Sequence, residues 1–205
     1  MRKQLAGAVA RRSRAKKISW LRERIKAGST VLVVGADTVA HGAGALGVGN
    51  IVERGLGEFA DIHALVYGTG DPGLGCPVTR GDARELPFPE KSFDYVFSNA
   101  VIEHVGGPES GRKMLAESVR VARLGAFHTT PNRWFPVETH TQVPLLHWLP
   151  RSWQPTAFAR VGQPRWTPER YWLYGRDALA RLDPRFHVER ASPITLVAVW
   201  ESGRN

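Results

Sequence analysis

The stretch RGDARELPFPEKSFDYVFSNAVIEHV, residues 80–105, decides the fold of this chain. It holds the end of one strand-like run, at Asp82, and a complete second run over residues 93–97, which leads into Asn99. In an open α/β sheet, ligands bind outside the carboxyl ends of the strands. These two polar strand ends therefore predict that Asp82 and Asn99 lie at one edge of a sheet, beside a ligand.

Further apolar runs of strand length surround this stretch and predict the rest of the sheet. They are residues 30–35, 61–68, 124–130, 186–190 and 194–200. Short apolar, β-branched runs that end in glycine or polar residues are typical of buried strands. Residues 112–123 instead carry apolar side chains at helical spacing, so we expect an amphipathic helix against one face of the sheet.

The string from Gly81 to Val105 resembles the central motifs of class I S-adenosylmethionine-dependent methyltransferases, in particular the methyltransferase type 11-like subfamily with the pattern GDA..LPF...SFD.V.S...EHV. The resemblance implies an α/β fold with a Rossmann-like, doubly wound, mostly parallel seven-stranded sheet that ends in an antiparallel strand. It also implies S-adenosylmethionine as the cofactor. In such proteins the acid at Asp82 accepts the adenine amino group, the backbone at Ala83 meets the adenine ring, and the segment at Asn99 lies beside the methyl donor.

The loop after the first strand departs from the family pattern. Laid on the family's VLDVGCGTG, the chain keeps Gly35 and Thr38 but has Val33 for the acid and Asp37 and Val39 for two glycines. Glycine is used where the backbone must approach a ligand closely or adopt positive φ. Gly35 and Asp37 are candidate cofactor contacts, and the alternative is that this loop is a plain connector.

An acid is expected after the second strand, because a carboxylate can accept hydrogen bonds from both ribose hydroxyls. The chain offers Asp71, within the sequence Gly-Asp-Pro-Gly and one residue later than the family position. Asp-Pro-Gly is also an ordinary turn sequence. Both interpretations of Asp71 stay open.

Three histidines are candidate general bases, in the order His104, His128 and His140. Imidazole titrates near neutral pH and can take the proton that an attacking hydroxyl or amine loses. His104 could instead cap the turn after its strand, with Glu103 beside it as a helix-surface group. No metal is expected, since Glu138, His140 and His147 match no compact zinc spacing.

Residues 131–172 hold 7 of the 14 prolines and five of the seven tryptophans. Regular strands cannot use so many prolines. The segment resembles a cap insertion of relatives that carry TPNRWFP.E.HT..P..HWLP, which implies a small acceptor that is apolar, aromatic or lipid-linked. The alternative is an irregular subdomain with its own aromatic core, and both can hold.

Positive charge is concentrated in residues 1–26, which form a predicted basic arm ahead of a methyltransferase-like domain over residues 27–205. Ten of the 28 Lys and Arg lie there against one of the 19 acids, so the arm carries the whole net charge of +9. The arm could contact anionic membrane lipids or nucleic acid. It could also be a partly helical leader whose Ile18, Trp20, Leu21 and Ile25 pack on the domain while its charges face water. Nucleic acid is the least favoured of these partners of the arm. DNA amino methylation is disfavoured separately, because the family's mark for it, Asn/Asp-Pro-Pro-aromatic, is absent after the strand at residues 93–97.

The remaining composition bounds the cell compartment and the alternative functions. The single cysteine, Cys76, agrees with a reducing compartment. We expect a cytoplasmic protein that residues 1–26 could also hold at the membrane surface; the oligomeric state is open. A second hypothesis is a non-catalytic relative that has lost cofactor affinity and acts as a binding protein. A nicotinamide-dependent oxidoreductase is disfavoured, because no GxGxxG follows the first strand.

Overall fold

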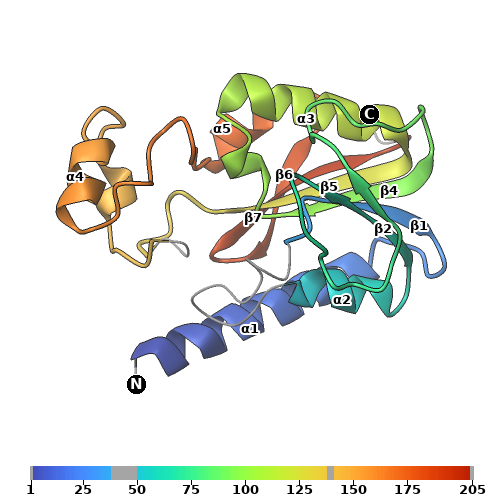
Figure 1. Cartoon of the computed structure of the whole chain (residues 1–205), viewed down its shortest axis with the longest axis horizontal. Coiled ribbons are helices and arrows are strands. Elements are labelled where there is room, and N and C mark those ends of the chain that lie inside the picture. Colours follow the sequence, from blue (N-terminus) through green and yellow to red (C-terminus); the bar gives the residue numbers. More distant parts are fainter. Residues whose placement is uncertain (1, 38–49, 138–140, 204–205) are drawn as a thin grey trace.

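A computed structural model describes residues 2–37, 50–137 and 141–203, with side chains from residue 11 onward. In this part of the chain the predicted α/β architecture is confirmed: seven strands form one sheet in the order β3-β2-β1-β4-β5-β7-β6, and only β7 runs against its neighbours (Figure 1). The strands are β1 (Thr30–Val34), β2 (Asp61–Val66), β3 (Val78–Arg80), β4 (Phe93–Asn99), β5 (Ala122–Pro131), β6 (His187–Ser192) and β7 (Thr195–Glu201). Because the strand order reverses between β1 and β4, the crevice for a ligand is expected at their carboxyl ends.

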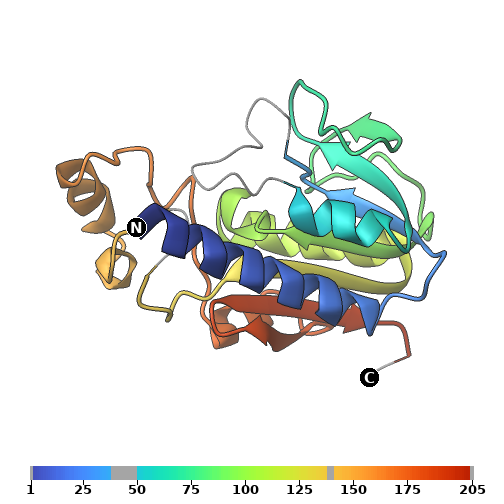
Figure 2. The same ribbon diagram turned by 90° about the horizontal axis from the view of Figure 1, so that it is seen from below.

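Helices cover both faces of the sheet. Helices α1 (Arg2–Arg22) and α2 (Ile51–Gly57) lie on one face, and α3 (Pro108–Val121) and α5 (Arg176–Ala180) lie on the other (Figures 1 and 2). Alternate residues of β4 point to opposite faces, as a strand requires: Phe97 belongs to the core under α1, and Val96 to the core under α3.

The second half of α1 is part of the fold. Trp20, Leu21 and Ile25 are buried, which confirms the interpretation of this segment as a helical leader packed on the domain. The α1 and α2 helices approach closely at Gly55, where an added Cβ would lie 2.6 Å from Cδ1 of Ile18. Two residues further along α1, the indole of Trp20 donates a hydrogen bond to Glu189 of β6 at 3.2 Å.

Strand β5 is longer than the sequence predicts. It spans ten residues and continues to Pro131, one residue past the predicted end, and it pairs with β4 on one side and β7 on the other. Pairing on both edges explains why the strand persists through the polar residues His128, Thr129 and Thr130, whose side chains are all buried. This extension decides where His128 points.

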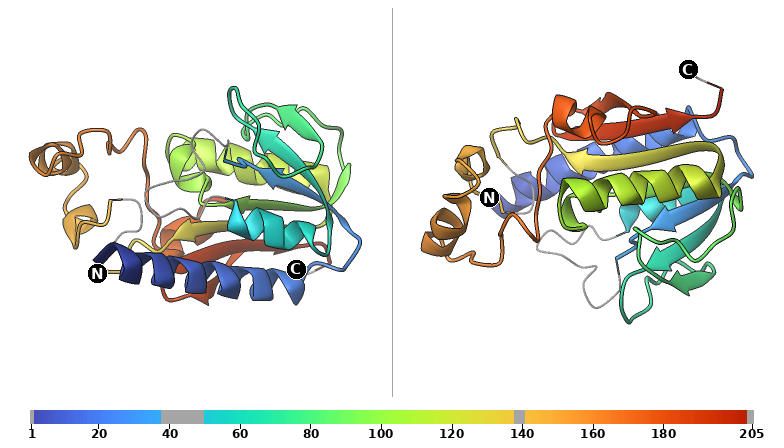
Figure 3. Two further views of the ribbon diagram at one scale, coloured as in Figure 1. Left: turned by 60° about the horizontal axis from the view of Figure 1, so that its bottom comes forward. Right: turned by 90° about the horizontal axis from the view of Figure 1, so that it is seen from above.

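The proline- and tryptophan-rich segment leaves the sheet at the carboxyl end of β5. Its described part contains η2 (Leu146–Trp148) and α4 (Gln154–Arg160), and it projects beyond the sheet in every view (Figures 1 and 3). The chain departs and returns at neighbouring points, because Asn132 bridges Tyr174 and the amide of Arg133 donates to the carbonyl of Tyr174 at 3.0 Å. None of the described helices has the length and apolar character needed to cross a membrane.

Candidate active site

A cavity of about 280 Å³ lies at the carboxyl ends of β1, β2 and β3 and against the short helix η1 (Ile102–His104). Its volume is close to the lower end of the range for small-molecule sites, about 300–1,000 Å³. Four of the predicted site residues line it: Gly35, Asp82, Ala83 and His104. The structure therefore brings these four predicted site residues together around one cavity.

Gly35 is required at its position by two independent features. Its φ is +74°, a conformation that side chains disfavour. A Cβ built on it would lie 2.6 Å from Cγ2 of Val101, which follows β4. Any larger residue would therefore push Val101 away and change the wall of the cavity.

Asp82 is held as a carboxylate by its neighbour Arg84. One oxygen accepts from the Arg84 amide at 2.9 Å, and the guanidinium contacts the other at 2.5 Å. These hydrogen bonds hold the pKa of Asp82 below its ordinary value. Asp82 is thus an ionised acceptor at neutral pH, and Arg84, which the sequence analysis did not single out, shares its oxygens with any ligand.

Asn50 organises the loop after β1. Its side-chain oxygen accepts from the amide of Asp37 at 3.1 Å, and its nitrogen donates to the carbonyls of Asp37 at 2.7 Å and Pro72 at 3.0 Å. One amide therefore ties the loop after β1 to the loop after β2. Thr38 and Val39 lie outside the described residues, and the exposed Asp37 side chain does not line the cavity.

Asp71 behaves as a turn residue. Its carboxylate accepts from the amide of Gly73 at 2.8 Å, and it does not line the cavity. Tyr67, just past β2, lines the cavity instead and is 77% exposed. An aromatic side chain at the end of a buried strand is a signal that the sequence analysis missed.

His104 lies between the cavity and the cap. Its Nδ1 is 3.3 Å from the carbonyl oxygen of Arg170, and its ring packs at 5.1 Å from that of Tyr171. Because a carbonyl only accepts, this contact assigns the proton of a neutral ring to Nδ1 and leaves the lone pair on Nε2. In this tautomer, His104 can accept a proton at Nε2.

The prediction that His128 lies at the edge of the sheet is wrong. Its side chain is fully buried, hydrogen-bonded through Nδ1 to Ser98 at 2.8 Å, and packed near Phe186 in the core under α3. Burial lowers the pKa of His128 to about 3. The reason is that β5 continues for three residues beyond it. His140, the third candidate, lies outside the described residues.

Asn99 points away from the 280 Å³ cavity, toward α1, and is the centre of a polar cluster. Its Oδ1 accepts from Nζ of Lys17 at 2.8 Å and from the hydroxyl of Thr129 at 3.0 Å. Its Nδ2 donates to Oε1 of Glu53 at 3.0 Å. The expectation that the charges of α1 all face water is thus wrong for Lys17, whose ammonium is directed into this cluster. Burial lowers its pKa to about 8.

Two carboxylates beside this cluster are buried and only half satisfied. Glu53 is 5% exposed and Glu103 is 0% exposed, which overturns the prediction of Glu103 as a helix-surface group. Oε2 of Glu103 accepts from the hydroxyl of Thr130 at 2.9 Å. Oε2 of Glu53 and Oε1 of Glu103 have no hydrogen-bond partner, and burial raises the pKa of Glu53.

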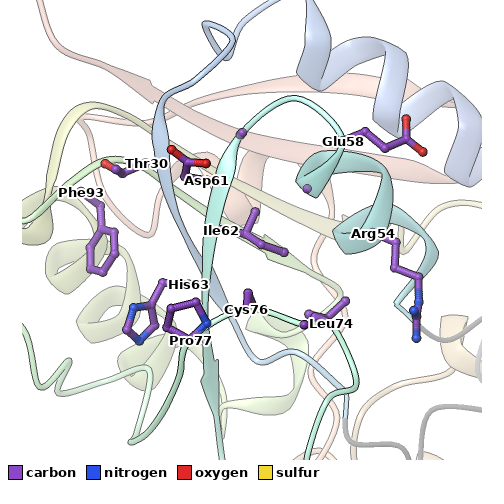
Figure 4. A pocket seen from close by; sticks show the side chains of 13 residues that line it. Thr30, Arg54, Glu58, Asp61, Ile62, His63, Leu74, Cys76, Pro77 and Phe93 are labelled. Carbon is purple, nitrogen blue, oxygen red and sulfur yellow. The ribbon is translucent and has the colours of Figure 1, made fainter.

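A larger cavity, of about 610 Å³, opens at the opposite edge of the sheet (Figure 4). Thr30 and Asp61 line it at the amino ends of their strands, and Cys76 and His63 lie on its wall. Parallel sheets bind ligands at their carboxyl ends, so we assign no reaction to this cavity despite its size. Burial raises the pKa of the Cys76 thiol, which disfavours the nucleophilic thiolate. In the described part of the chain no group of three or more His, Cys, Asp or Glu is placed to hold a metal ion.

Comparisons with known proteins show which family model and which solved structures this chain resembles. Residues 64–129 match the family model described as a methyltransferase domain. No curated protein matches the sequence. Among solved structures, a protein of Pyrococcus horikoshii is 16% identical, with a TM-score of 0.56 over 89% of this chain and 86% of the other. A S-adenosylmethionine-dependent methyltransferase of Aquifex aeolicus is also 16% identical, with a TM-score of 0.52 over 90% and 87%.

A third structure was determined with the cofactor bound. It is the phosphoethanolamine N-methyltransferase 2 of Haemonchus contortus in complex with S-adenosylmethionine, 18% identical, with a TM-score of 0.52 over 82% of this chain and 36% of the other. At these identities the likeness shows a shared Rossmann-like fold. Residues 64–129 therefore match the central part of a methyltransferase domain, and the fold around them agrees with that match.

Proposed function

We propose that the protein transfers a methyl group from S-adenosylmethionine to an oxygen or nitrogen of a small acceptor held between the 280 Å³ cavity and the cap. The observation that carries the proposal is the cavity itself, at the strand-order reversal and lined by Gly35, Asp82, Ala83 and His104. These residues fit the nucleoside end of the cofactor. Asp82 is an ionised acceptor for an amino group, and the bare Gly35 leaves room for close approach.

Bound S-adenosylmethionine supplies an electrophilic methyl group, so the protein has mainly to position the acceptor and remove its proton. His104 is the base we favour, because it lines the cavity and its Nδ1 is held by the carbonyl of Arg170 at 3.3 Å. The rings of Trp166 and Tyr171 in the cap lie 6.4 and 5.1 Å from the same imidazole, which is itself exposed to solvent. His140 remains a second candidate, and His128 is excluded by its burial.

The composition of the cap supports an apolar or lipid-linked acceptor. Six of the nine exposed large apolar side chains of the described residues lie in this segment: Trp134, Val137, Leu145, Trp148, Trp153 and Val161. Tryptophan is enriched where proteins meet the membrane interface. The first half of α1, with Arg2, Lys3, Arg11 and Arg12, projects from the same end of the molecule (Figure 2). We therefore propose a cytoplasmic enzyme that is held at the membrane surface by both segments.

Calorimetric titration with S-adenosylmethionine and S-adenosylhomocysteine tests the function. We expect micromolar binding, and a loss of about tenfold or more in Asp82→Ala, since a hydrogen bond to a charged group contributes about 1.5–3 kcal/mol. Asp61→Ala removes an exposed aspartate at the opposite edge and is the matched control, expected to bind as the wild type does. Absence of binding at millimolar ligand would favour the non-catalytic alternative.

A further inference from the structure

The polar cluster around Asn99 contains hydrogen-bond donors and acceptors that its own members do not satisfy. The Lys17 ammonium has three N–H groups and two acceptors among the described residues, Asn99 Oδ1 at 2.8 Å and Thr129 Oγ1 at 3.4 Å. Glu53 and Glu103 each keep one buried oxygen without a donor. Leaving a buried polar atom unpaired costs about 1–3 kcal/mol, and more when the group is charged. Such atoms therefore indicate a missing partner.

The charges of the cluster indicate the chemistry of that partner. Lys17 and Arg14 are cations and Glu53 and Glu103 are carboxylates, and the fields of the other three all act on the Lys17 ammonium. The cluster combines a cation with an unused N–H and carboxylates with unused oxygens, and its formal charges balance. An α-amino acid, which carries one ammonium and one carboxylate and is neutral overall, has the complementary groups.

The position of the cluster fits the same ligand. Glu53 is three residues beyond Asn50, whose side chain holds both backbone groups of Asp37 in the loop after β1. Asn99 ends β4, the strand that follows the order reversal. The cluster thus lies at the carboxyl edge of β1, β4 and β5. In the sequence, β1 and the loop after it have Val33, Asp37 and Val39 in place of the acid and two glycines of the family pattern.

We propose that Lys17 and Glu53, joined through Asn99, bind the amino-acid end of S-adenosylmethionine and take over the role of the residues missing from the first loop. Lys17 receives the carboxylate of the ligand and Glu53 its ammonium. Helix α1, which the sequence presents as a basic leader, then supplies part of the cofactor site. The inference rests on the proposed function, because it concerns the same cofactor.

The test compares two ligands that differ only at the amino-acid end. S-adenosylhomocysteine carries it, whereas 5′-methylthioadenosine keeps the nucleoside and the thioether but has no amino acid. Binding of both is measured by calorimetry in the wild type, Lys17→Met and Glu53→Gln. We expect each variant to weaken S-adenosylhomocysteine about tenfold or more and to leave 5′-methylthioadenosine within about twofold.

The second ligand also separates loss of a contact from loss of the fold, because a misfolded variant would bind neither ligand. Asp82→Ala, at the nucleoside end, should weaken both ligands and is the matched control. Equal weakening of the two ligands in Lys17→Met and Glu53→Gln, or unchanged binding of S-adenosylhomocysteine, would overturn the inference and leave the proposed function standing. If the wild type bound neither ligand, the proposed function would fall and the inference with it.

Discussion

At the scale of single residues, the buried His128 makes the free energy of unfolding depend on pH. The folded protein keeps it neutral, with a pKa of about 3, whereas the unfolded chain protonates it near 6.5. Because its folded pKa is lowered, its contribution to stability is complete above pH 6.5 and is lost as the pH falls toward 3. Acid therefore unfolds the protein partly through this one residue.

The prediction is a difference in pH dependence between the wild type and His128→Asn. Between pH 7 and pH 5 the wild type should lose about 2 kcal/mol of unfolding free energy that the variant does not lose. Urea unfolding at both pH values measures it, and comparing each protein with itself cancels the direct cost of the substitution. Equal losses in the two proteins would show that His128 does not titrate on unfolding.

At the scale of secondary-structure elements, α1 is the element whose role changes most between sequence and structure. Leu21 lies on α1, is 0% exposed and belongs to the core that this helix covers. Leu21→Ala should lower the unfolding free energy by about 2–5 kcal/mol, as other buried Leu→Ala changes do. Leu124→Ala, on β5 and 42% exposed, is the control and should cost less than about 1 kcal/mol.

Urea titration of both variants gives the answer. If residues 1–26 were an arm independent of the domain, Leu21→Ala would leave the midpoint of unfolding unchanged. A single transition shifted to lower urea would place the helix within the cooperative unit.

The strands were predictable because each buried parallel strand is a short apolar run that ends at a glycine or a polar residue, a local signal. The place of Asp82 and Ala83 at the cavity was predictable because they follow the short strand β3 at its carboxyl end. Lys17 was not, because nothing local distinguishes it from the neighbouring cations of a strongly basic segment. Its partner Asn99 is 82 positions away, and only the packing of α1 on the sheet brings the two together.

At the scale of the whole molecule, the exposed aromatic residues of the cap and the basic half of α1 form one end of the protein. We predict that this end binds vesicles containing anionic lipid and binds zwitterionic vesicles much more weakly. Salt at about 0.5 M shortens the Debye length to several ångströms and should therefore reduce the binding. The double variant Trp134→Ala/Trp153→Ala, at side chains 62% and 63% exposed, should bind several-fold more weakly.

Co-sedimentation with the vesicles measures the bound fraction. Val78→Ala, which removes an exposed apolar side chain from the distant β3, is the matched control. Binding that the double variant retains in full would assign the contact to α1 alone, and no binding to anionic vesicles would exclude the membrane as a partner of this end.

The two points where the cap segment joins the sheet, Asn132 and Tyr174, have a consequence for how proteins of this fold diversify. Because the chain leaves the sheet at Asn132 and returns beside it at Tyr174, the two ends of the cap are already joined. A gene could exchange the intervening segment for a shorter loop or a different subdomain while the strands on either side kept their pairing. The cap and the sheet can then evolve independently. We expect the sequences of close relatives to differ far more between Asn132 and Tyr174 than in the strands of the sheet.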